Sequence, residues 1–197
     1  MPEGLFIIRV VLGGLLFAHG AQKLFGWYGG YGLDGTGGFF ESVGHRPGRT
    51  MAMLAGISEA GGGLLLLMGL FTPLGSAMII GTMIVAAYSV HKDNGLWATN
   101  GGYELPLINA AVAAGLAFAG AGKWSLDSAF DTPWNRGWGT GLLAVCVAGL
   151  AAGAVLARRN QQLAAAPSDT DAYPEAPEVA ADPATADSAE RADRVTS

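Results

Sequence analysis

Cysteine and charge are both scarce in this sequence, and each shortage excludes a class of protein. Cys146 is the single cysteine among 197 residues, so a disulfide within the chain and redox chemistry by a cysteine pair are excluded. Charged residues account for 14% of the chain. With a mean hydropathy of +0.35, the chain is too apolar for an ordinary soluble domain and indicates a membrane protein.

Motifs for metals, nucleotides and nucleophiles are missing as well. The three histidines show neither HxxH nor HExxH spacing, so we expect no metal site, although a haem held between His19 and His91 is a geometric alternative. The sequence has no Ser-His-Asp pattern and no phosphate-binding GxxxxGK[ST] string. It also lacks a basic patch, which argues against nucleic-acid binding.

Long apolar stretches are present instead, and they approach the length of about 20 residues that a membrane span requires. They are 5–25, 51–71, 74–91, 104–120 and 139–157. The first has neither a basic start nor a small-residue cleavage site, so we expect a retained helix and not a signal peptide. The sequence therefore predicts an all-α integral membrane fold, with a four-helix bundle in residues 1–130 and a fifth transmembrane helix in 131–160.

The last part of the chain, residues 161–197, has a different composition. From Leu163 onward there are eight acidic and two basic residues, with much Ala and Pro and almost no large apolar side chain. Such a segment cannot bury a core, so we expect a disordered acidic tail. It is either a solvated tail without a specific role or an arm that binds a partner.

Alternating spans would give the bundle two distinct sides. Side A holds the connections 26–50 and 92–103 and the C-terminus, whereas side B holds the N-terminus, the turn at 72–73 and the connection 121–138. Near the helix ends, side A carries six Lys or Arg residues and side B carries two. In the inner (plasma) membrane of a cell, this bias predicts an orientation with side A in the cytoplasm and the N-terminus outside.

Glu59 is the only ionisable residue of stretch 51–71, where an unpartnered charge costs about 2.5–3.5 kcal/mol. Arg9, His19 and Lys23 of the first stretch lie within an arc of about 80 degrees on one helix face. His19 lies about 9 Å from its helix end and Glu59 about 12 Å from its own, at 1.5 Å per residue. We therefore favour a His19–Glu59 pair over an Arg9–Glu59 pair, and predict that Glu59 and His19 exchange protons. A purely structural Arg9–Glu59 ion pair is the alternative.

Further polar and aromatic residues are expected to gather around this pair on side A. The connection 26–50 is rich in glycine and aromatic residues, and we interpret it as a lid at the membrane interface. The candidate ligand-binding residues are Arg9, Gln22, Lys23, Trp27, His91, Trp97 and Glu104. The simpler interpretation is that the charged members are interfacial anchors in water. Hydrogen-bond donors, a proton-exchanging group and an apolar slot suit a lipid-soluble quinone, so the cofactor hypothesis is menaquinone or ubiquinone.

Several segments together resemble the DoxX family of small bacterial membrane proteins. They are the run from Arg9 to Trp27 (RVVLGGLLFAHGAQKLFGW), GISEAGGG at 56–63, His91, and NGGYE at 100–104. The resemblance covers residues 5–130 with the motifs in family order, and it implies a fold of four helices. The fifth helix and the tail are additions that it does not explain.

The resemblance also implies an association with membrane oxidoreductase assemblies, such as a thiosulfate:quinone oxidoreductase and archaeal terminal quinol oxidases. It carries over no agreed catalytic residues. We therefore expect a membrane subunit of a redox complex, surrounded by lipid and bound to protein partners, with a homo-oligomer as an open alternative. Two other functions stay open: a non-catalytic anchor for soluble redox enzymes, and a small-solute transporter, for which no inverted repeat is visible.

Overall fold

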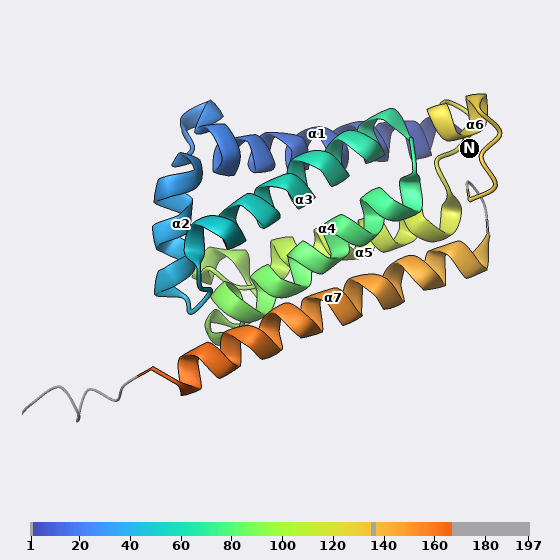
Figure 1. The fold of residues 1–197 in the computed structure, drawn as a ribbon. Coiled ribbons are helices and arrows are strands. Elements are labelled where there is room, and N and C mark those ends of the chain that lie inside the picture. The colour runs from blue at the N-terminus through green and yellow to red at the C-terminus, as the bar shows by residue number, and fades with distance from the viewer. Residues whose placement is uncertain (1, 135–136, 167–197) are drawn as a thin grey trace, which may run out of the picture. The chain divides into compact units, whose positions relative to one another are not determined.

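The computed structural model describes residues 2–134 and 137–166, and within these ranges the chain is all-α, without a strand. Five long helices lie side by side (Figure 1). They are α1 (Pro2–Phe25), α3 (Gly48–Met68), α4 (Thr72–Ala86), α5 (Glu104–Ala119) and α7 (Trp138–Ala164). The short helices α2 (Gly32–Ser42) and α6 (Leu126–Ala129) lie at opposite ends of this bundle, α2 on side A and α6 on side B.

Four helical segments are long and apolar enough to cross a membrane, which confirms the predicted membrane fold. They are Glu3–Phe25, Gly48–Met68, Thr72–Asn94 and Trp138–Ala164. The third continues α4 through a π-helical turn, η2 (Ala87–His91), and a 3-10 turn, η3 (Lys92–Asn94). At 16 residues, α5 is shorter than a typical span, about 24 Å at 1.5 Å per residue.

The fifth predicted span differs from the observed helix at its C-terminal end. We expected this span to end at residue 157, but α7 continues to Ala164. Residues 161–164, which we assigned to the acidic tail, are therefore helical. The predicted tail from residue 167 onward and Arg136 lie outside the described residues.

Small residues set the contact between α1 and α3. A Cβ on Gly13 would lie 2.6 Å from the carbonyl oxygen of Gly63, and one on Gly20 would lie 2.3 Å from the backbone nitrogen of Ala60. A Cβ on Gly63 would in turn lie 2.5 Å from the backbone nitrogen of Phe17. Any larger residue would push the backbones apart, so this glycine seam fixes the separation of the two helices.

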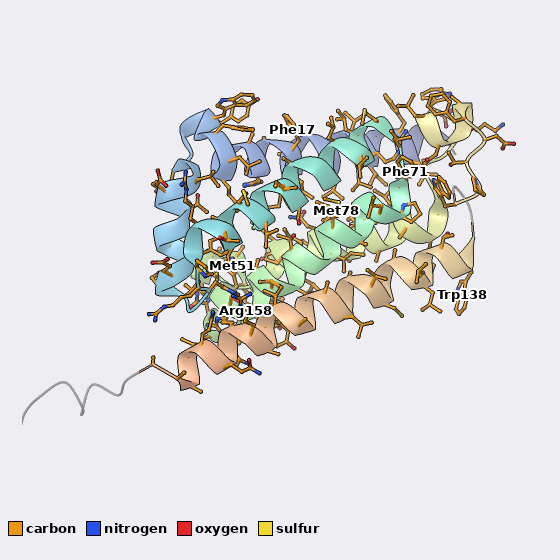
Figure 2. The ribbon with its side chains drawn as sticks, in the orientation of Figure 1. Phe17, Met51, Phe71, Met78, Trp138 and Arg158 are labelled. Atoms are coloured by element: carbon orange, nitrogen blue, oxygen red, sulfur yellow. The ribbon has the colours of Figure 1, made fainter. Side chains whose placement is uncertain are left out.

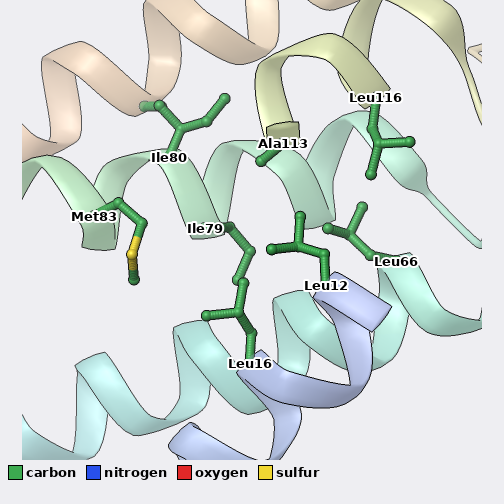
Figure 3. Packing of buried hydrophobic residues seen from close by; sticks show 9 residues of the cluster. Leu12, Leu16, Leu66, Ile79, Ile80, Met83, Ala113 and Leu116 are labelled. Atoms are coloured by element: carbon green, nitrogen blue, oxygen red, sulfur yellow. The ribbon is translucent and has the colours of Figure 1, made fainter. Parts of the chain in front are cut away.

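The apolar core lies between α1, α3, α4 and α5 (Figure 3). Its buried members are Leu12, Leu16, Leu66, Ile79, Ile80, Met83, Ala113, Leu116 and Ala148. The last of these belongs to α7, whose buried face also contains Gly141, Ala144 and Ala152. These small residues recur every three or four positions and allow α7 to pack closely on α4 and α5.

Candidate functional site

The buried carboxylate of α3 has a partner from α1, but it is not the predicted one. Glu59 is 4% exposed, and Lys23 Nζ donates a hydrogen bond to its Oε2 and forms an ion pair with it. His19 is exposed, so the predicted His19–Glu59 pair is wrong as a contact. The prediction ranked the partners of Glu59 by their depth along the helix axis alone. Lys23 lies one turn nearer to side A, about 40 degrees around the helix from His19, and its longer side chain reaches the carboxylate.

Arg9 was expected to provide a counter-charge for Glu59, and this prediction is also wrong. Its side chain is completely buried on side B. Nη1 donates to the carbonyl oxygens of Leu66 at 3.2 Å and Leu67 at 3.3 Å, and Nη2 donates to that of Trp124. Arg9 therefore satisfies the free carbonyl groups at the C-terminal end of α3.

Asp127 performs the matching task at the start of α4 and was missed by the sequence analysis. Its carboxylate accepts hydrogen bonds from the backbone nitrogens of Phe71 at 2.9 Å and Thr72 at 3.0 Å. The hydroxyl groups of Thr72 and Thr132 donate to it at 2.8 Å and 3.0 Å. Arg9 and Asp127 together close the turn between α3 and α4, and we call them the side-B lock.

The remaining predicted ligand-binding residues organise the connections on side A. Gln22 Nε2 donates to the carbonyl oxygen of Tyr28 at 3.3 Å, and His91 Nδ1 lies 2.6 Å from that of Gly101. Glu104 Oε2 accepts from the backbone nitrogen of Ala98 at 2.9 Å. Trp27 and Trp97 are exposed. The structure thus brings Lys23 and Glu59 together, whereas Gln22, His91 and Glu104 bond to the backbone of nearby connections.

The apolar space of side A lies elsewhere, on the face of α3 that points away from α1. A groove of about 280 Å³ opens between α3, α4 and α7. Leu54, Ser58, Met78, Thr82, Ala151 and Val155 line its length, and Phe40 and His45 lie at its side-A end. Figure 2 shows Met51, which also lines the groove, at the side-A end and Met78 further along.

His45 is the polar group at the end of this groove. It is 2% exposed, and its Nε2 lies 2.8 Å from Ser89 Oγ. Burial lowers the pKa of the His45 imidazole below its ordinary value near 6.5, and the positive charge of Arg159 lowers that pKa further. The neutral ring is therefore favoured at neutral pH.

The partner of His45 belongs to an unusual piece of helix. Ser89 lies in η2, where α4 widens into a π-helix before it ends. Such turns occur frequently at functional sites, because the extra residue displaces a side chain from the regular helical position. Nothing in the sequence signalled the burial of His45, which follows a glycine-rich loop, or the π-helix that carries Ser89.

Comparisons with known proteins agree with this architecture. Residues 4–92 match the family model described as DoxX. The chain is similar to two uncharacterised proteins of Haemophilus influenzae. One is 29% identical over 132 residues, covering 66% of this chain and 92% of the relative. The other is 39% identical over 64 residues, covering 32% of this chain and 42% of the relative. No solved structure matches the chain. The matched region contains Lys23, His45, Glu59 and Ser89, so these residues belong to the part of the chain that matches the DoxX model, residues 4–92.

Proposed function

We propose that this protein is a membrane subunit of a bacterial oxidoreductase complex and binds a quinone in the groove between α3, α4 and α7. The observation that carries the proposal is the combination of an apolar groove with one buried, neutral-favouring histidine at its end. Ligand sites for apolar molecules are mostly hydrophobic and contain few polar groups, which orient the ligand. A bound quinone would supply the capacity to accept electrons and protons.

His45 is suited to orient such a ligand. Because Ser89 holds Nε2, the ring has a defined orientation, and Nδ1 is the atom left to face a ligand. A neutral imidazole donates or accepts a hydrogen bond according to its tautomer, and a pKa near the working pH permits proton transfer. In this proposal His45 takes the proton-exchanging role that the sequence analysis gave to His19.

Glu59 keeps its proposed role as a proton-exchanging group, with Lys23 as its counter-charge. Ser58 lines the groove, whereas Glu59, the next residue along α3, points about 100 degrees away from it around the helix and pairs with Lys23 of α1. Lys23 is 25% exposed and connects the pair to the surface of side A. This arrangement supports a path for protons between water and the interior of the bundle.

The charged residues of side A support an orientation in the membrane, and its exposed aromatic residues support a surface for partners. The excess of Lys and Arg on side A supports an orientation with side A in the cytoplasm of the cell and the N-terminus outside. Trp27, Tyr31 and Trp97 are exposed at 51%, 86% and 61% on the same side. Exposed aromatic residues are enriched in protein interfaces, which supports contact with other subunits there.

A groove-filling substitution tests the quinone site. The full-length protein is reconstituted in lipid nanodiscs, and the binding of a short-chain menaquinone analogue is measured by quenching of tryptophan fluorescence. Ala151→Phe places a ring in the groove and should weaken binding at least tenfold. Ala157→Phe makes the same change at an exposed position of α7 outside the groove and should leave binding unchanged. If the wild type and Ala151→Phe bound the menaquinone analogue with equal affinity, the groove would not be the quinone site.

A further inference from the structure

A second recess lies beside the groove at its side-A end, and its lining is cationic. It has a volume of about 280 Å³ and lies between the start of α3, the last turns of α7 and the loop before α3. The polar lining residues are His45, Arg46, Arg158, Arg159 and Gln162. The recess shares the lining residues His45, Met51, Leu54 and Val155 with the groove, so the two spaces adjoin. Figure 2 shows Arg158 and Met51 at this end of the bundle.

Hydrogen bonds to the backbone hold this recess in place. Gln162 pairs with Arg46 in both directions: the Arg46 nitrogen donates to Oε1 at 3.0 Å, and Nε2 donates to the Arg46 carbonyl oxygen at 2.7 Å. Arg159 Nε donates to the carbonyl oxygen of Val43 at 2.6 Å. These bonds tie the end of α7 to the loop before α3 and use the backbone of Arg46, not its guanidinium group.

None of the three arginine side chains that line the recess has an acidic partner among the described residues. Within residues 2–134 and 137–166, the ion pairs are Lys23–Glu59 and Arg49–Asp34. The exposed side chains of Arg46 and Arg158 therefore carry uncompensated positive charge in the described part of the chain. No acidic residue lines the recess there, so its complement is an anion.

We propose that this recess binds the phosphate headgroup of an anionic phospholipid, with Arg46 and Arg158 as the phosphate ligands. Guanidinium groups match phosphate oxygens with paired hydrogen bonds. A lipid is favoured over a free anion because Met51, Leu54 and Val155 provide an apolar wall directly beside the charges. The acyl chains would follow the exposed apolar surfaces of α3 and α7. This site does not depend on the quinone proposal.

Lipid selectivity tests this assignment. The full-length protein is reconstituted with spin-labelled phosphatidylglycerol or phosphatidylcholine, and electron paramagnetic resonance measures the motionally restricted fraction of each. We expect a several-fold preference for phosphatidylglycerol in the wild type and its loss in Arg46→Gln/Arg158→Gln. Both positions are exposed, so this variant should keep the helical content and elution volume of the wild type.

A matched variant separates the recess from general charge attraction. Arg49→Gln/Lys123→Gln removes the same number of positive charges at exposed positions outside the recess. It should keep the preference for phosphatidylglycerol. Equal loss in both double variants, or no preference in the wild type, would overturn the assignment. A preference that emerges only after Asp169, Asp171 and Glu175 are replaced by their amides would assign the recess to the acidic tail instead of a lipid.

Discussion

The two ends of the bundle use buried polar groups in opposite ways. On side B, Arg9 and Asp127 are both 0% exposed and direct their hydrogen bonds to the helix ends beside them. On side A, the Lys23–Glu59 pair stays partly open to the surface, and His45 ends an apolar groove. A buried charge whose hydrogen bonds all lie around one turn fixes that turn, whereas a polar group at the end of a groove is open to further contact. The comparison supports a stabilising role for side B and agrees with the binding proposed for side A.

The closed character of side B is visible at Gly69. This residue has a φ of +62°, and a Cβ there would lie 2.1 Å from Arg9 Nη1. The Asp127 backbone nitrogen donates to the Gly69 carbonyl oxygen at 2.8 Å. Arg9 and Asp127 therefore pack so closely around Gly69 that no side chain fits at this position. Within the described residues, Arg9 Nε is the one buried guanidinium nitrogen without a hydrogen-bond partner.

The largest effect is expected from breaking the side-B lock. Asp127→Ala removes the acceptor of four hydrogen bonds and the negative charge nearest to Arg9. Removing one partner of a buried charged network costs about 3–5 kcal/mol. The measurement is the free energy of unfolding in mixed micelles. Asp93→Ala, at an exposed position of η3, is the control and should change stability by less than about 0.5 kcal/mol. Similar values for the two variants would contradict the lock.

Gly69→Ala should produce the next largest loss. The left-handed backbone costs an alanine about 1–2 kcal/mol, and the contact with Arg9 adds an overpacking penalty of about 1–3 kcal/mol. Gly153→Ala is the matched control, because a Cβ there meets no atom within 4 Å in the middle of α7. It should stabilise the helix by about 0.4–1 kcal/mol. The two substitutions should therefore shift the unfolding free energy in opposite directions. Equal shifts would show that the backbone and packing at position 69 do not require glycine.

Neutralising the side-A pair should cost less than breaking the side-B lock. In Glu59→Gln the amide can still accept a hydrogen bond from Lys23, and the ammonium group, at 25% exposure, can turn towards water. We expect a loss of about 1.5–3 kcal/mol, the range for a hydrogen bond to a charged group. The unfolding assay used for Asp127→Ala measures it directly. If Glu59→Gln were the more damaging variant, Glu59 and not the side-B lock would be the main structural charge.

The sequence predicted the path of the chain well and the partners of its polar residues poorly. Apolar runs of span length predicted the long helices, since length and hydropathy decide which segments enter a membrane. The pairing of Glu59 was missed because depth was estimated along the helix axis, while the reach of Lys23 and its angle around α1 decided the contact. Asp127 in the short helix α6 and His45 in a loop gave no signal, because their burial depends on helices distant in sequence. Fold follows from local pattern here, whereas the site follows from tertiary packing.

The smallest effect, and the one that best separates the ends of the bundle, is the pH dependence of His45. Its folded pKa lies below the ordinary value near 6.5, so between these two values the unfolded chain binds more protons than the folded one. The stability contributed by the neutral ring is complete above pH 6.5 and is lost as the pH falls through the lowered pKa. The wild type should therefore lose more unfolding free energy than His45→Gln between pH 7.5 and about pH 5. The histidines His19 and His91 are unchanged in both proteins, so the difference between the two pH profiles reports His45 alone. Superimposable profiles would mean that the imidazole is as free to accept a proton in the fold as in water, and His45 could then not be the buried polar end of the groove.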